Sequence, residues 1–192
     1  MSAVARYLDP GAPALLARLA APRRALFLDR DGVINRDLGY VHRADQVEWV
    51  PGIFALCADA LARGWVPVVV TNQAGIARGY YDEATFLAFT AWMHAEFARR
   101  GAPLLGTWYC PHHPTAGLGA WRRDCACRKP QPGMLRAAGD ELAIDLSASF
   151  LLGDTDGDIE AARRAGVGHA LRLTGDALPS FTALAELARR PA

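Results

Sequence analysis

The sequence predicts an α/β protein with an open, Rossmann-like, doubly wound parallel sheet. Short apolar runs alternate along the chain with segments that have the spacing of amphipathic helices. The apolar runs show no two-residue alternation of apolar and polar side chains, which is typical of strands covered by helices on both faces. Strands and helices that alternate in this way form parallel sheets with right-handed crossovers.

Five apolar runs are expected to form the buried strands. In chain order they cover residues 25–29, 66–71, 103–110, 149–153 and 169–173. Because open α/β sheets bind their ligands at the carboxyl ends of the strands, we expect the active site at that edge.

Helices are expected between these strands. The first has an apolar face from Ile53 to Leu61, so Cys57 is expected to pack in the core as a small apolar side chain. The second covers residues 82–100, with Asp82 as N-cap and a stripe of Phe and Met. The third covers residues 158–165, where early acidic and late basic side chains complement the helix dipole.

A single domain over residues 23–192 is expected, after an N-terminal extension of residues 1–22. Residues 14–20 of the extension have the pattern of a short amphipathic helix. One loop and one helix between residues 31 and 66 leave no room for a large cap domain, which predicts an open site.

The composition excludes several classes of protein. The chain has 192 residues, 52% of them hydrophobic, and 21 basic residues balance 20 acidic ones to a net charge of +1. This excludes a disordered chain and gives no general attraction to nucleic acid or acidic membranes. The sequence has no apolar run of about 18 residues and no convincing signal peptide at its start. We therefore expect a cytoplasmic protein with no nucleic-acid or membrane partner. We also expect a monomer, because no exposed apolar stripe is left over once the predicted helices are packed.

A cluster of Cys and His side chains lies in an irregular stretch, the loop of residues 110–130. Cys110, His112, Cys125 and Cys127 match a structural zinc site in ligand number and type. The one-residue gaps are tighter than the usual two, and His113 is an alternative to His112. Reduced cysteines without metal are the other interpretation. A zinc ion here would fold the loop and leave no open coordination position.

Carboxylates follow two of the predicted strands. Asp29 and Asp31 come directly after the first strand, and Asp154, Asp156 and Asp158 follow the fourth. If these strands are neighbours, the two acidic groups converge, and oxygen ligands in such an array suit Mg²⁺. The alternative is that these residues are helix caps and turn formers.

Four motifs stand in order at the predicted strand ends: FLDRDGVIN, VVVTNQ, CRKP and LLGDTDGD. Together they resemble those of the haloacid dehalogenase (HAD) superfamily of aspartate-nucleophile phosphatases. The resemblance implies that Asp29 attacks phosphorus and that Asp31 protonates the leaving oxygen, then activates water. It also implies that Thr71 and Lys129 stabilise the transferring phosphoryl group.

The same resemblance implies a magnesium site. Its ligands would be Asp29, the backbone carbonyl of Asp31, and Asp154. Asp158 would begin a helix or support the site from behind.

Within the superfamily, the chain most resembles the D-glycero-D-manno-heptose 1,7-bisphosphate 7-phosphatases. The residues that favour this subfamily include the GIARGY segment of residues 75–80. The resemblance implies substrate contacts from Asp37, Leu38, Gly39, Tyr40, Asn72, Gln73, Ala74 and Arg128. Histidinol-phosphate phosphatase is the alternative activity, and a binding module without catalysis is a more distant one. A nucleic-acid end-processing phosphatase is disfavoured by the net charge of +1.

The chain departs from the subfamily pattern in two places. The N-terminal extension is one. The other is Thr155, which follows the expected metal ligand Asp154 where some members have a Lys that touches the substrate.

Overall fold

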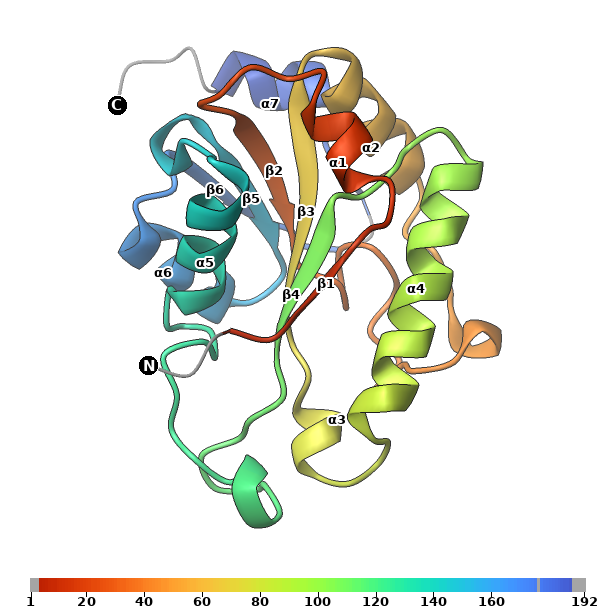
Figure 1. Cartoon of the computed structure of the whole chain (residues 1–192), viewed down its shortest axis with the longest axis vertical. Helices are drawn as coiled ribbons and strands as arrows, with labels where there is room; N and C mark the ends of the chain where they lie inside the picture. Colours follow the sequence, from red (N-terminus) through yellow and green to blue (C-terminus); the bar gives the residue numbers. More distant parts are fainter. Residues whose placement is uncertain (1–3, 176, 188–192) are drawn as a thin grey trace.

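The computed structural model describes residues 4–175 and 177–187, and it confirms the predicted α/β sheet (Figure 1). Six strands lie in the order β1-β4-β3-β2-β5-β6. All neighbouring strands are parallel except β1 and β4, which are antiparallel. The strands are β1 (Arg6–Leu8), β2 (Arg24–Leu28), β3 (Trp65–Asn72), β4 (Gly106–Cys110), β5 (Phe150–Gly153) and β6 (His169–Arg172).

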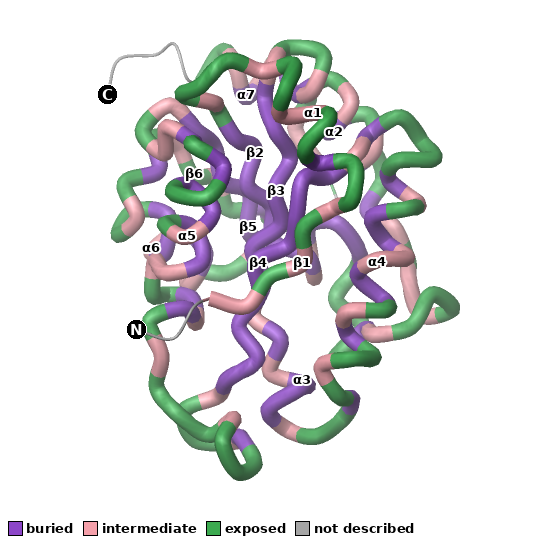
Figure 2. The backbone as a smooth tube through the Cα atoms, viewed as in Figure 1, coloured by how far each residue is buried: buried purple, intermediate pink, exposed green. Residues whose placement is uncertain are grey.

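Helices cover both faces of the sheet, as the apolar runs predicted. Along β2, Phe27 faces one core, and Leu26 and Leu28 face the other. The Phe27 side packs against α1 (Ala12–Leu16), α5 (Gly133–Leu142) and α6 (Asp156–Ala165). The opposite side packs against α2 (Ile53–Ala62), α4 (Glu83–Arg99) and α7 (Phe181–Leu187). Figure 2 shows the central strands almost wholly buried between these layers.

The helix ends follow the local sequence signals. The Asp82 side chain accepts a hydrogen bond from the backbone N–H of Thr85 and caps α4 as predicted. Helix α6 starts at Asp156, two residues before the expected start, because Thr155 and Asp158 form a capping box. It ends at Gly166, whose φ of 82° is a conformation that glycine adopts without strain.

The segment before residue 23 contributes to the same sheet. It adds β1 at the edge, which was not predicted, and its helix spans Ala12–Leu16 rather than residues 14–20. Ala12 is buried, and Leu15, Leu16 and Leu19 pack against the core next to α5.

The connections place the functional residues at one end of the sheet. Between β2 and β3 lie only η1 (Ala44–Gln46) and α2. A short helix, α3 (Ala74–Ala77), follows β3, and the Cys-rich loop with η2 (Gly119–Trp121) follows β4 (Figure 1). Another short helix, η3 (Leu146–Ala148), precedes β5. No helix in the described part of the chain has the length and hydropathy to cross a membrane.

Candidate active site

Three carboxylates meet where β2 and β5 end. Because these strands are parallel neighbours, Asp29 after β2 lies beside Asp154 after β5. One oxygen each of Asp29, Asp154 and Asp158 lies within 4.8 Å of the others. Gly32 permits the approach, since a Cβ at this position would lie 2.3 Å from Asp154 Oδ2. The carboxylates border a cleft of about 360 Å³, large enough for a small ligand.

Lys129 lies in the middle of this acidic group. Its ammonium donates to Asp29 Oδ1 and to the Val70 carbonyl oxygen, each at 2.8 Å, and also pairs with Asp158. Burial opposes the charge of the ammonium, but Asp29 and Asp158 raise the pKa of Lys129. Burial raises the pKa of Asp29 to about 7, and the nearby Lys129 charge only partly offsets that effect.

The donor set fits a divalent cation. Asp154 Oδ1 is buried without a hydrogen-bond partner among the described residues, and burial followed by the charge of Asp158 raises the pKa of Asp154. Asp158 Oδ1 forms an ion pair with the Lys129 ammonium, and Asp158 Oδ2 accepts hydrogen bonds from Thr155. Asp29 and Asp154 therefore offer the carboxylate oxygens to a cation, and Asp158 supports Lys129 and α6.

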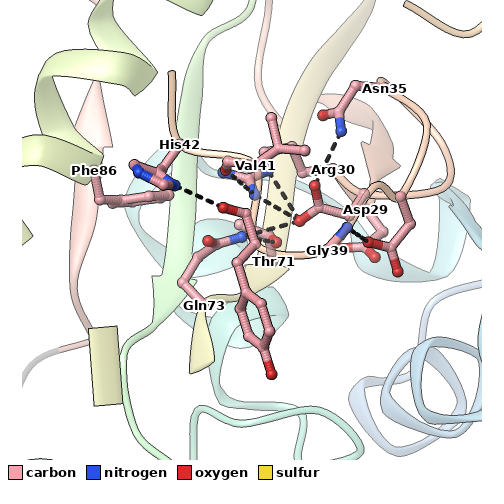
Figure 3. A network of polar contacts seen from close by, with 12 residues as sticks. Asp29, Arg30, Asn35, Gly39, Val41, His42, Thr71, Gln73 and Phe86 are labelled. Carbon is pink, nitrogen blue, oxygen red and sulfur yellow. Dashed lines mark hydrogen bonds and ion pairs between the residues drawn. The ribbon is translucent and has the colours of Figure 1, made fainter. Parts of the chain in front are cut away.

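The Asp31 side chain is not part of this group of three carboxylates, and it is held by Arg30, Asn35 and Gln73, which Figure 3 labels. Arg30 Nη2 donates to Asp31 Oδ2 at 2.7 Å, and Asn35 Nδ2 donates to Asp31 Oδ1 at 3.0 Å. A longer hydrogen bond of 3.3 Å comes from Gln73 Nε2. The carboxyl group of Asp31 is thus fixed at the cleft while its side chain stays 20% exposed.

Residues at and just after the end of β3 also line the cleft. Thr71 is buried, and its hydroxyl accepts a hydrogen bond of 2.9 Å from Gln73 Nε2. The amide of Asn72 donates to the Lys129 carbonyl and accepts from the Lys129 N–H, so it orients the backbone of Lys129. Gln73 accepts in turn from the Tyr81 hydroxyl, and burial raises the pKa of Tyr81 to about 12.

The loop of residues 37–40 also borders the cleft. The side chain of Asp37 accepts from the Gly39 N–H, and Tyr40 has a φ of 54°, an uncommon value for a residue with a side chain. Asp37, Gly39, Tyr40 and Ala74 line the cleft. Leu38 and Arg128 are not among its lining residues: Leu38 is 54% exposed, and Arg128 donates to the His112 carbonyl.

The Cys and His side chains of the loop after β4 form a compact cluster. One ligand atom each of Cys110, His112, Cys125 and Cys127 lies within 4.8 Å of the others. The sulfur atoms are 3.2–3.4 Å apart, and His112 directs Nδ1 toward two of them. His113 lies outside the cluster and accepts from the Ala116 N–H. Arg123 Nη2 lies 2.7 Å from His112 Nε2, on the side of the ring away from the sulfur atoms. Three thiols and the Nδ1 atom of an imidazole that converge in this way fit a tetrahedral zinc ion.

Three residues near the cleft were not singled out from the sequence: Arg30, Asn35 and Tyr81. Arg30 stands inside a recognised motif, and its position between two aspartates directly after a buried strand is the signal that could have identified it. Asn35 ends the same motif but does not stand beside the strand end, and Tyr81 lies outside all four motifs. Their partners Asp31 and Gln73 lie four and eight residues away.

Comparisons with known proteins give a consistent result. A family model described as HAD-hydrolase-like matches residues 126–192. The D-glycero-alpha-D-manno-heptose-1,7-bisphosphate 7-phosphatase of Burkholderia mallei is 48% identical over 169 residues, which cover 88% of this chain and 89% of that relative. The crystal structure of the D,D-heptose 1,7-bisphosphate phosphatase from B. bronchiseptica, complexed with magnesium and phosphate, superposes with a TM-score of 0.67. The two sequences are 37% identical, and the superposition covers 76% of this chain and 78% of the B. bronchiseptica chain. A HAD-like protein from Mesorhizobium loti superposes with a TM-score of 0.79 at 35% identity, covering 88% and 86% of the two chains.

Proposed function

The chain belongs to the family of HAD-like hydrolases that includes the D-glycero-D-manno-heptose 1,7-bisphosphate 7-phosphatases, and we propose that it removes the 7-phosphate of that bisphosphate. The observation behind this proposal is the cleft in which Asp29, Lys129 and Asp154 meet, with Asp31 beside them. The similarity to the Burkholderia mallei phosphatase favours the heptose substrate over histidinol phosphate. The presence of both Asp29 and Asp31 argues against a binding module without catalysis.

The reaction proceeds in two steps through Asp29. In the first, a carboxylate oxygen of Asp29 forms a bond to phosphorus, and the bond from phosphorus to the sugar oxygen breaks. Protonated Asp31 gives its proton to that leaving oxygen. In the second step, water attacks the phosphorus of the aspartyl-phosphate, Asp31 takes a proton from the water, and the bond to Asp29 breaks to release phosphate.

Thr71 and Lys129 stabilise the phosphoryl group during both steps. The buried ammonium of Lys129 lies 2.8 Å from Asp29 Oδ1, so its charge is already next to the carboxylate that receives phosphorus. In this reaction positioning and positive charge supply most of the catalysis, because the transition state spreads negative charge over the phosphoryl oxygens.

Mg²⁺ is the proposed cofactor of the cleft. Asp29, Asp154 and the backbone carbonyl of Asp31 would hold it, and when bound it neutralises charge on the phosphoryl oxygens. Asp154 is suited to this role because its Oδ1 has no hydrogen-bond partner among the described residues.

A structural zinc ion is proposed for Cys110, His112, Cys125 and Cys127. Arg128 and Lys129 directly follow Cys127, so an ordered zinc loop fixes the segment that delivers the ammonium. Four protein ligands leave no position for substrate, which makes the role structural.

The substrate contacts follow the walls of the cleft. Asp37, Gly39 and Tyr40 on one side and Asn72 to Ala74 on the other would meet the sugar and its phosphate. Leu38 and Arg128 would contact substrate from beyond the cleft itself.

A direct comparison of substrates tests this function. The kcat/KM values for both anomers of D-glycero-D-manno-heptose 1,7-bisphosphate are measured with Mg²⁺ beside the value for histidinol phosphate. We expect clear preference for a heptose bisphosphate, with release of the 7-phosphate. Asp29→Asn is the control and should lower kcat by at least roughly 10³-fold, as removal of a nucleophile does. Preference for histidinol phosphate, or turnover by Asp29→Asn, would contradict the proposal.

A further inference from the structure

Arg30 is a buried cation that the mechanism above does not use. It follows the nucleophile Asp29 directly, and it is only 1% exposed. A charged side chain is rarely buried unless other groups compensate its charge. The partners that compensate Arg30 therefore indicate its role.

One partner is the carboxylate of Asp31. Arg30 Nε and Nη2 lie 3.1 and 2.7 Å from Asp31 Oδ2, so two arms of the guanidinium meet a single oxygen. The Arg30 side chain is 1% exposed and that of Asp31 is 20% exposed. The guanidinium is thus shielded from solvent while the Asp31 carboxyl group stays partly exposed, and both residues border the cleft.

The other partners join Arg30 to its surroundings. Nη2 also donates to the Val41 carbonyl at 2.8 Å, at the end of the loop that carries Asp37 and Tyr40 (Figure 3). Its Cζ atom lies 5.8 Å from the ring centroid of Phe86 and 5.4 Å from that of Phe89, both on α4. Such ring faces stabilise a desolvated cation. The Arg30 side chain therefore connects Asp31, the loop of residues 37–41 (the substrate loop) and helix α4.

We propose that Arg30 is a positioning residue, which holds Asp31 in the orientation needed to move protons and couples it to the substrate loop. The inference rests on the proposed phosphatase function and on the proton-transfer role of Asp31. A general acid must lie within hydrogen-bond reach of the leaving oxygen, so its orientation decides its efficiency. Asn35 supports the other oxygen of Asp31 and assists in the same task.

A positioning role of Arg30 predicts a kinetic effect that a merely structural role would not produce. Departure of a sugar oxygen requires a proton from Asp31, because an alkoxide is a poor leaving group. Departure of p-nitrophenolate requires none, since its negative charge is delocalised. The kcat/KM value reports the step that forms the aspartyl-phosphate. Misplacing Asp31 should therefore lower kcat/KM for the sugar phosphate and spare kcat/KM for p-nitrophenyl phosphate.

The experiment compares both substrates in Arg30→Ala, Arg30→Lys and Asp31→Asn. For Arg30→Ala we expect kcat/KM to fall by roughly 10²-fold with the heptose bisphosphate, within the range of general acid catalysis, and only slightly with the aryl phosphate. Asp31→Asn should show the same selective loss, and Arg30→Lys a smaller one. Millimolar guanidine should partly restore Arg30→Ala with the sugar substrate. The exposed Arg99, paired with Glu96 on α4, provides the control Arg99→Met, which should resemble the wild type.

Two results would overturn the inference. An equal loss with both substrates would assign Arg30 to folding alone, and an unchanged Arg30→Ala would remove its role. If Arg30→Ala does not fold, the same comparison is made with Arg30→Lys and Asn35→Ala. The ratio of kcat/KM for the heptose bisphosphate to kcat/KM for p-nitrophenyl phosphate in these variants then decides the question. Failure of the wild type to hydrolyse the heptose bisphosphate would instead reject the proposed function.

Discussion

Lys129 is the only lysine among 192 residues that include 20 arginines. Its ammonium reaches Asp29, Asp158 and the Val70 carbonyl from a side chain that is 5% exposed. Three oxygen partners around one small nitrogen are the geometry of a compact ammonium. A planar guanidinium is wider and presents its N–H groups in a fork. The cationic residue type therefore matters here beyond its charge.

Exchange of this lysine for arginine tests that argument. Lys129→Arg preserves the charge, but the guanidinium does not fit the same buried point between Asp29 and Asp158. We expect kcat to fall by roughly 10²-fold, the scale of losing one preorganised charge contact. Steady-state kinetics measure this, with circular dichroism to show that the variant is folded. Near-normal turnover would mean that any cation suffices at this position.

The residues that could be predicted from the sequence are those next to strand ends. Asp29, Thr71 and Asp154 each follow or end a buried run, and parallel strands bring such positions together at one edge. Arg30 is different, because its function depends on Val41 and Phe86, which local pattern does not place beside it. The role of a side chain whose partners are distant in sequence can be inferred only from the folded structure.

Among the secondary-structure elements, β1 is one that the sequence pattern could not predict. The strand has three residues, and two of them are exposed. Its residues pair with β4 as Arg6 with Trp108 and Leu8 with Gly106. A strand this short is stabilised by the neighbour it pairs with, so it has no apolar run to detect. The longer central strands were predicted because burial on both faces dictates their composition.

Asp9 and His94 link the segment after β1 to helix α4. Asp9 Oδ2 lies 3.0 Å from His94 Nδ1, and His94 Nε2 lies 2.9 Å from the Thr107 hydroxyl. The hydrogen bond from His94 holds the pKa of Asp9 below its usual value despite partial burial. The unfolded chain therefore binds more protons than the folded one in the acidic range, and stability rises with pH there.

The variant Asp9→Asn tests how much the contact between Asp9 and His94 stabilises the fold. At pH 7 we expect a loss of about 1 kcal/mol in the free energy of unfolding, typical of one hydrogen bond. The difference from wild type should stay constant down to about pH 4 and shrink below it, as Asp9 protonates. Urea unfolding across this range measures both effects. Asp45→Asn, at a 72% exposed position, is the control and should change little. A difference that grows toward acidic pH would contradict the assignment.

The loop of residues 110–130, with the proposed zinc site, is the second element whose stability is expected to depend on a specific interaction. We expect one zinc per chain by elemental analysis of the purified protein. Cys125→Ser should lose most of the metal and of the turnover, because Lys129 lies four residues beyond Cys125 in the same loop. Cys57→Ala is the matched control: Cys57 is buried in the core on the other face of the sheet, so the variant should retain zinc. Purified wild-type protein without zinc would count against the site.

At the scale of the molecule, the site and the N-terminal segment occupy different parts of one sheet. The cleft lies where β2, β3 and β5 end, near its centre, whereas β1 forms the edge beyond β4. The N–H of Tyr109 donates to the Ala5 carbonyl, and the N–H of Asp9 donates to that of Leu105. These bonds occupy backbone groups of β4 and of the residue before it that an open edge would present to another chain.

Removal of residues 2–10 should therefore affect association more than catalysis. The truncated chain leaves β4 as an open edge, whose backbone groups are a template for pairing with a second molecule. We expect the midpoint of thermal unfolding to fall by roughly 5–10 °C, and association to increase with protein concentration. Light scattering after size-exclusion chromatography measures the association, and kcat/KM in dilute solution should stay near the wild-type value. Arg6→Ala, which removes the ion pair with Glu141 but keeps the strand, is the control and should behave like the wild type. A truncated protein that stays at the wild-type oligomeric state at high concentration would show that β1 does not protect this edge.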